Sequence, residues 1–294
     1  MATSFAGLTP YNFGFNTCPP GRRDPTLLSD PNGECPICVI AIVAAVFGTT
    51  NLAVQASNGE INNFGDGAKA FFSGAIAGAA IATGVITGLG VPVLGTIIKG
   101  AGIVYGGTLG LGTVSGLGEG VFNGDWSRLG NTWKTFAGNF YLDGNRNIFG
   151  QTWQGISRFS WELPQSTIGH GYSQLRNTFG GVDRVDYFGG ATFSTGVNPT
   201  SNRIWGVSIG NNINISRRRD EFDILNDPLL MHEYGHTFDS QLFGSLYLFG
   251  IGLPSATGAN WTELRANRYA AHYFSRRFGV DWTPFATNFP LNSN

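Results

Sequence analysis

Charged side chains are scarce in this 294-residue sequence: they make up 13% of it, about half the share usual in soluble domains. The 18 basic and 19 acidic residues nearly cancel and leave a formal net charge of −1. This balance excludes a global basic field that would attract nucleic acid. We therefore expect no nucleic-acid partner.

Cysteine is also rare, since Cys18, Cys35 and Cys38 are the only three. An odd count without a second Cys pair argues against a disulfide framework and against a four-cysteine zinc site, so we expect unligated thiols. The N-terminus has no basic segment followed by an apolar core and a small-residue cleavage site. No Sec signal peptide is expected, and secretion or delivery into a target cell would use another route.

Glycine, in contrast, is abundant: the 44 glycines are roughly double the average usage of about 7%. Three stretches carry no charge, and each is long enough to cross about 30 Å of hydrocarbon as a helix. They are Cys35–Gly59, Ala70–Ile98 and Gly100–Gly118. Small residues recur three or four apart in Gly74–Gly78 and Gly84–Gly88, a spacing that lets helix backbones approach closely.

These features predict a glycine-zipper-like hydrophobic helical region over residues 35–125, with membrane contact through 35–118. A buried glycine-rich packing unit inside a soluble protein is the alternative. Residues 1–34 carry several Pro and Gly turn signals and indicate an irregular segment.

Charge and tryptophan return from Asp125 onward, so we expect a globular domain over 126–294. Strand-forming segments at 182–188, 204–209 and 213–215 predict a small meandering sheet. A helix is expected after Asn226-Asp227-Pro228, ending by Gly244, and a second over 260–278 before Gly279. The fold class is α+β: a small sheet plus two helices, preceded by the hydrophobic helical region.

The first of these helices contains His232-Glu233-Tyr234-Gly235-His236, an H-E-x-x-H pattern. Positions four apart share one helix face, so His232 and His236 can present two ring nitrogens to one Zn²⁺. Glu233 then lies beside the metal, placed to take a proton from a metal-bound water as that water attacks a carbonyl. The pattern predicts a zinc-dependent hydrolase.

A catalytic zinc normally has three protein ligands and one open position. The best third ligand is Glu263, near the start of the second helix, with Asn267 one turn later as a hydrogen-bond support for a ligand. Asn260-x-x-Glu263 also has the spacing of a reciprocal helix cap, in which Glu263 would serve only the backbone. Asp239 is an alternative oxygen ligand.

The residue that stabilises the oxyanion is left open by the sequence. Four residues are candidates for it: Tyr234, Tyr269, Tyr273 and His170. Residues 204–216 are candidates for the edge strand on which a peptide substrate is held by backbone pairing.

The H-E-x-x-H motif with a downstream Glu resembles the gluzincin metallopeptidases. That resemblance implies His232, His236 and Glu263 as ligands, Glu233 as general base and acid, and a short sheet above an active-site helix. The chain departs from the family at Asn267, where the Glu-x-x-x-Asp pattern has Asp.

A second resemblance covers most of the chain. Ser29–Glu34 looks like the last turn of an Rhs repeat core, after which polymorphic bacterial toxins carry variable C-terminal domains. The metallopeptidase-like ends of such proteins are similar to several segments here. These segments are Leu163–Thr167, Tyr187–Thr192, His232–His236 and Leu253–Ser255.

Together these resemblances imply a bacterial toxin used in competition between cells, delivered by an Rhs core or secretion system and accompanied by a cognate immunity protein. Its toxin domain would be a zinc metalloprotease that cleaves a protein in the recipient. One alternative is a membrane-inserting or pore-forming toxin whose zinc domain is structural or self-processing. Another is an endogenous membrane-bound housekeeping protease.

Overall fold

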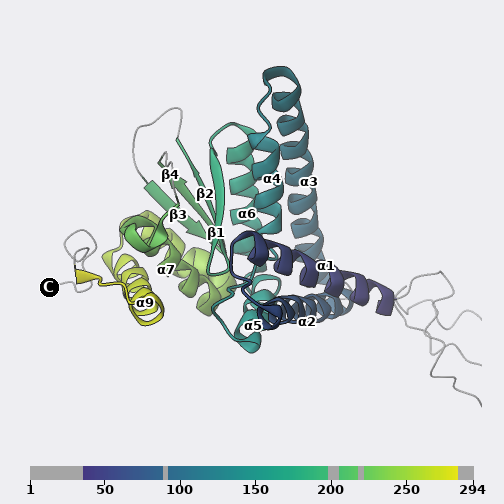
Figure 1. Cartoon of the computed structure of the whole chain (residues 1–294), viewed down its shortest axis with the longest axis horizontal. Helices are drawn as coiled ribbons and strands as arrows, with labels where there is room; N and C mark the ends of the chain where they lie inside the picture. The colour runs from purple at the N-terminus through teal and green to yellow at the C-terminus, as the bar shows by residue number, and fades with distance from the viewer. Residues whose placement is uncertain (1–35, 89–91, 198–204, 218–221, 284–294) are drawn as a thin grey trace, which may run out of the picture.

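The computed structural model describes residues 36–88, 92–197, 205–217 and 222–283. The expected N-terminal segment 1–34, with its Rhs-like turn, lies outside these residues. Within them the chain is mostly helical and carries one small four-stranded sheet (Figure 1).

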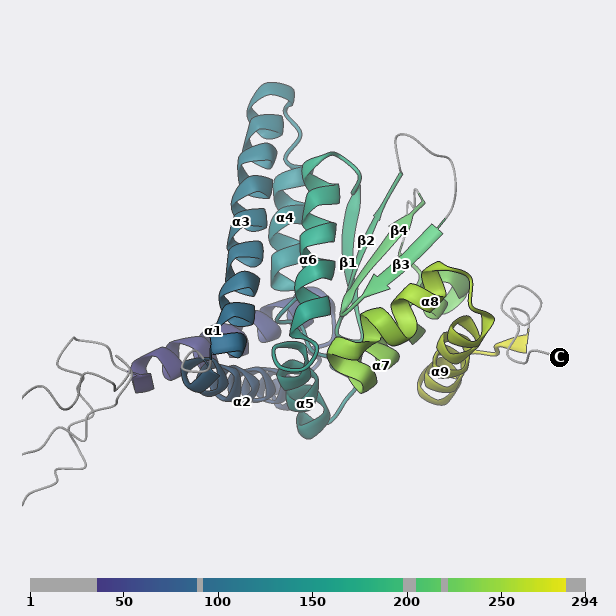
Figure 2. The same ribbon diagram turned by 180° about the vertical axis from the view of Figure 1, so that it is seen from behind.

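The glycine-rich region forms three long helices, α1 (Pro36–Ser57), α2 (Phe64–Gly88) and α3 (Pro92–Asn123). Helices α1 and α2 lie side by side as a hairpin, whereas α3 points in a different direction (Figures 1 and 2). Glycine permits the close packing of the hairpin, because a Cβ on Gly74 would lie 2.7 Å from the Phe47 carbonyl oxygen, and one on Gly78 would lie 2.8 Å from Phe47 Cβ. The predicted close approach at 74–78 is confirmed. Gly84 has nothing near its Cβ position.

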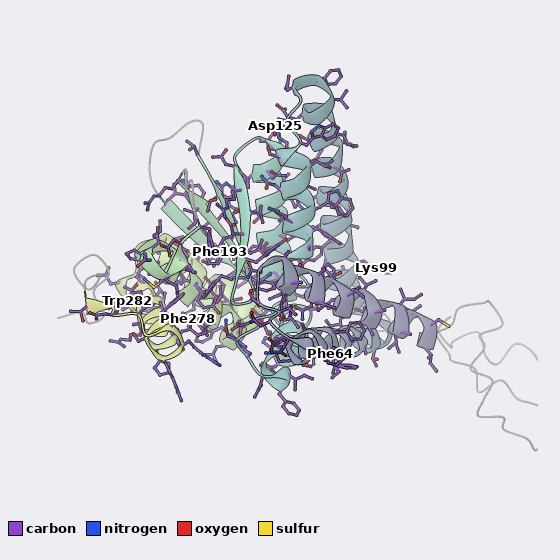
Figure 3. The ribbon with its side chains drawn as sticks, in the orientation of Figure 1. Phe64, Lys99, Asp125, Phe193, Phe278 and Trp282 are labelled. Carbon is purple, nitrogen blue, oxygen red and sulfur yellow. The ribbon has the colours of Figure 1, made fainter. Side chains whose placement is uncertain are left out.

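All three helices are long and apolar enough to cross a membrane. Much of their apolar surface is exposed, including Ile42, Ile103, Val114 and Phe122. The charged residues Lys99 and Asp125 lie toward opposite ends of α3 (Figure 3).

Polar side chains nevertheless dock the α1–α2 hairpin onto the rest of the chain. Asn51, buried in α1, donates to the Ala70 carbonyl at 2.7 Å and accepts from the Leu142 amide at 2.8 Å. Gln55 donates to the Leu142 carbonyl at 3.0 Å, and Ser73 of α2 donates to Gln151 at 2.6 Å. The hairpin therefore has one polar face that is satisfied only in this packing.

Three shorter helices follow: α4 (Ser127–Ala137), α5 (Ile148–Arg158) and α6 (Leu163–Thr178). The strands are β1 (Arg184–Phe188), β2 (Ala191–Gly196), β3 (Trp205–Ile209) and β4 (Asn212–Ser216), in the spatial order β1-β2-β4-β3. The expected meander is wrong, because β4 pairs parallel with β2 and antiparallel with β3. Strand β3 therefore lies at the edge.

Strand β4 shows why the sheet is covered on both faces. Ile213 and Ile215 join an apolar core with residues of the two C-terminal helices, whereas Asn214 on the opposite face bonds Ser173 of α6 at 2.9 Å. Figure 3 marks Phe193, a member of the same core, on the sheet, and Trp282 beyond the last helix. The result is a layer of α3, α4 and α6, then the sheet, then the C-terminal helices (Figures 1 and 2).

The C-terminal part contains η1 (Ile224–Asn226), α7 (Pro228–Phe243), η2 (Gly244–Leu246), η3 (Leu248–Gly252), α8 (Leu253–Ala256) and α9 (Asn260–Phe278). The two helices expected from the sequence are confirmed as α7 and α9. The expectation of unligated thiols is wrong for Cys38, which is disulfide-bonded.

Candidate metal centre

Helix α7 places the two histidines of the motif on one face. The Asp227 carboxylate caps the helix by accepting from the Leu229 amide at 2.9 Å and the Leu230 amide at 3.2 Å, and Pro228 occupies the first turn. The His232 and His236 rings then lie one turn apart, with their centroids separated by 5.0 Å. The cap therefore fixes where α7 begins, and with it the helix face on which His232 and His236 lie.

Helix α9 approaches α7 closely at Gly235, which occupies the second x position of the H-E-x-x-H motif. A Cβ on Gly235 would lie 2.1 Å from the Ala266 carbonyl oxygen, so only glycine permits this separation of the two helices. Ala266 and Ala270 are fully buried between them. Gly279, in the left-handed conformation with φ 66°, ends α9. Close packing brings Glu263, in the first turn of α9, over the histidines.

His232, His236 and Glu263 form the one group within the described residues that can hold a metal ion. Glu263 Oε2 lies 3.0 Å from His232 Nε2 and 3.7 Å from His236 Nε2. Ligands bound tetrahedrally at about 2.0–2.1 Å are about 3.3–3.4 Å apart, which falls between these two distances. All three ligand atoms lie within 4.8 Å of one another, so they can converge on one small ion.

Asn267 supports His232 from behind. Its Oδ1 lies 2.7 Å from His232 Nδ1, so that nitrogen carries the proton and Nε2 presents its lone pair to an ion. His236 Nδ1 is buried and has no hydrogen-bond partner among the described residues. The two histidine rings are thus oriented differently: a hydrogen bond to the Asn267 amide orients His232, whereas packing alone orients His236.

The charges of the group are strongly coupled. Burial alone raises the pKa of the Glu263 carboxyl, but hydrogen bonds with His232, His236 and Ser255 outweigh burial and hold that pKa well below its usual range. Burial lowers the pKa of His232, yet the hydrogen bond to Glu263 and the charge of Glu233 outweigh it, and this pKa is raised. The carboxylate is therefore ionised and ready to bind a cation.

The second carboxylate oxygen of Glu263 is held by hydroxyl groups. Ser255 donates to Glu263 Oε1 at 2.5 Å, and Thr262 donates to the same atom at 3.3 Å. The alternative that Glu263 caps the helix with Asn260 is wrong, because Ala259 is the N-cap residue and no side chain caps this end. Nothing in the sequence spacing singles out Ser255, which reaches Glu263 from α8.

The Glu233 carboxylate lies between α7 and the edge strand β3. The Ser208 hydroxyl is 2.8 Å from Glu233 Oε2, and a Cβ on Gly206 would lie 2.2 Å from Glu233 Oε1. Glu233 is nearly buried, and no described cation forms an ion pair with it. The Glu233 carboxylate is therefore held against β3, next to the metal group.

The four residues considered for the oxyanion serve other contacts. Tyr234 donates to the Gly189 carbonyl at 3.0 Å, Tyr273 donates to Asp143 at 3.1 Å, and Tyr269 lies against Arg265. His170 is buried against Tyr105, and burial lowers its pKa to about 3. All four are packed aromatic residues.

Tyr247 was not expected from the sequence. Its buried hydroxyl donates to the Ser208 carbonyl at 3.0 Å, so it lies near the residue that holds Glu233. Burial and the charge of Glu233 raise its pKa, which keeps the phenol neutral and able to donate.

Asp239, the alternative third ligand, is not part of the group. Its Oδ1 pairs with Arg265 of α9 at 2.7 Å, and its side chain is fully buried. The ion pair ties α9 to α7 one turn beyond the histidines. Asp239 therefore stabilises the helix pair instead of joining the site.

Comparisons with protein-family models, with curated proteins and with solved structures found no match to this chain. The site must therefore be interpreted from its own geometry.

Proposed function

We propose that this chain is a zinc-dependent metallopeptidase in which His232, His236 and Glu263 hold the ion and Glu233 is the general base. One observation carries the proposal: two nitrogens from α7 and one carboxylate oxygen from α9 meet at separations that suit an N₂O zinc site with an open position. Zinc, when bound, polarises a carbonyl and makes water more acidic.

Glu233 would then carry out both proton transfers of the reaction. Glu233 takes a proton from the attacking water as the water oxygen bonds to the carbonyl carbon of the peptide. It then donates that proton to the leaving amine as the C–N bond breaks. Contacts with Ser208 and Gly206 hold the Glu233 carboxylate against β3, so the carboxylate is already in position before the substrate binds.

The substrate would be an extended peptide. Strand β3 pairs only with β4 among the described strands, so its other edge is open on the side of the sheet next to α7. A peptide can add to that edge by backbone hydrogen bonds, which would place its carbonyl groups along the strand that contacts Glu233.

The biological setting that we propose is a delivered bacterial toxin with a protein target in the recipient cell. The motifs similar to Rhs-associated metallopeptidase ends support this setting, together with three helices apolar enough to meet a membrane. An Rhs core or secretion system would deliver it, and an immunity protein would protect the producer.

The test replaces Glu233 by Gln in the full chain, with Glu119→Gln as the matched control, because Glu119 lies on α3 in an ion pair with Arg128. Wild type and control should arrest the growth of a bacterial host and generate new protein N-termini detectable by mass spectrometry. Glu233→Gln should do neither, yet should bind zinc in the same ratio. Undiminished cleavage by Glu233→Gln would refute the peptidase.

A second candidate is a membrane-inserting toxin, favoured by the exposed apolar residues of α1, α2 and α3. Dye leakage from liposomes distinguishes the two functions. Leakage that is equal for wild type, Glu233→Gln and a His232→Ala variant would establish membrane activity independent of the site. Absence of leakage alongside proteolysis would leave the peptidase alone.

A further inference from the structure

A second cavity, separate from the metal centre, lies where α2, α5, α7 and α9 come together. Its volume is about 1090 Å³, slightly above the range of about 300–1,000 Å³ typical of small-molecule sites. Lys69 comes from α2, Arg146 from the segment before α5, and His272, Arg276 and Arg277 from α9. Among the described residues that line it there is no Asp or Glu.

The concentration of positive charge here is unusual for this chain. Only 18 of its 294 residues are Lys or Arg, and four of these line this one cavity. Like charges gathered in one place repel unless a counter-charge is near. The buried Asp143 behind the wall accepts from Arg146 at 3.2 Å and so offsets one of the four.

The remaining cations point to a multiply charged anion. Arginine forks match phosphate oxygens in pairs, and a Lys ammonium adds a point charge. Helix α5 begins at the cavity: Asn147 caps the Gly150 amide at 2.8 Å, and both residues line the wall. The positive end of that helix adds to the field.

Aromatic side chains complete the wall. Phe238 of α7 and Tyr269 of α9 stack with ring centroids 5.7 Å apart, and Tyr273 lies beside them. They give the cavity an apolar lining beside the charged groups, on which the uncharged part of a ligand can rest.

We propose that this cavity binds a phosphorylated compound with more than one negative charge, either free in solution or as the headgroup of a phospholipid. The site requires neither zinc nor peptide cleavage. Because α7 and α9 contribute to both sites, while α2 and α5 contribute only to this one, a bound phosphate group would link the peptidase helices to the hydrophobic hairpin.

The test titrates the metal-free full chain with pyrophosphate in a calorimeter, metal-free because pyrophosphate chelates zinc. Arg276→Glu is compared with Arg268→Glu, which reverses the same charge on α9 outside the cavity. Loss of a charged hydrogen bond should weaken binding by about 10- to 100-fold in Arg276→Glu. Arg268→Glu should bind like wild type.

Vesicles distinguish the two sources of phosphate. Arg276-dependent preference for vesicles of phosphatidylglycerol and phosphatidylcholine over phosphatidylcholine alone assigns a lipid headgroup, and pyrophosphate binding without that preference assigns a free ligand. Unchanged zinc uptake by Arg276→Glu shows that the variant has folded. The proposal is overturned if neither probe binds wild type, or if Arg268→Glu loses as much affinity as Arg276→Glu.

Discussion

Substituting Ala for Gly235 changes the separation of α7 and α9 without touching any metal ligand. The new Cβ would lie 2.1 Å from the Ala266 carbonyl oxygen, and Cβ contacts under 3.0 Å are essentially never seen. The two helices must therefore separate by at least 0.9 Å at this point, because the obstacle is backbone and cannot rotate away. Glu263 lies three residues earlier on α9 and moves with it.

A shift of this size is several times the tolerance of about 0.2 Å within which metal–ligand distances are held. The loss should resemble the removal of an outer support of the site, a factor of about 10 to 100 in zinc affinity. Stability should change less, because overpacking costs about 1–3 kcal/mol while Ala in a helix regains up to about 1 kcal/mol over Gly.

The assay is zinc competition against a chromophoric chelator, followed by thermal unfolding with and without zinc. Gly130→Ala is the matched control, since Gly130 is in α4 with no atom near its Cβ position. This control should bind zinc as wild type does and unfold at a slightly higher temperature. Wild-type zinc affinity in Gly235→Ala would show that the contact with Ala266 does not set the site.

Three further outcomes are expected. Gly206→Ala should lower kcat strongly while zinc uptake stays unchanged, because a Cβ 2.2 Å from Glu233 Oε1 displaces that carboxylate but no ligand; a normal kcat with full zinc would contradict this. Asn51→Leu should lower the unfolding temperature and increase vesicle binding, since it leaves the buried Leu142 amide without its Asn51 partner, at about 1–3 kcal/mol; unchanged values in both assays would refute the docking role. Without bound metal, the pKa of His232 is raised and the pKa of Glu263 is lowered. Their ion pair therefore stabilises the fold at pH values between the two pKa values. This stabilisation is lost as pH rises through the pKa of His232, and it is also lost as pH falls through the pKa of Glu263. Zinc binding below the raised pKa should then release the His232 proton, measured by calorimetry in buffers of different ionisation enthalpy, and buffer-independent heats would argue against it.

The site was accessible from the sequence because its determinants are local. Asp227-Pro228 fixes where α7 begins and Gly279 fixes where α9 ends, so the helical period alone places the histidines on one face. The contact between Asn267 and His232 follows from one more turn of α9. In contrast, Ser255 contacts Glu263 from α8 and Ser208 contacts Glu233 from β3. Spacing along the sequence does not predict contacts of this kind between separate elements.

Helix α6 and strand β2 were missed for a different physical reason. Most residues of α6 are buried but polar, so the helix has no apolar stripe; Gln165 donates to the Gly244 carbonyl and Gln174 to the Thr132 carbonyl. Every residue of β2 is buried, which removes the alternation that marks a half-exposed strand. The prediction of a meander was wrong because β2 pairs parallel with β4. This pairing joins strands that are not consecutive in the chain, so the local turn residues do not predict it.

The polar face of the hairpin bears on whether α1 and α2 could enter a membrane while they are docked. In lipid, the buried amides of Asn51 and Gln55 would lose the backbone groups of Leu142 that they now contact, and hydrocarbon offers no replacement. Helix α3 also points away from the hairpin axis, so the three helices do not cross one bilayer together in this arrangement. Insertion therefore requires the hairpin to leave residues 141–151, and that same segment carries Arg146 and the start of α5 at the basic cavity. A state with α1 and α2 in a bilayer would therefore exclude the docked arrangement of the hairpin, so the two could not exist at once in one chain.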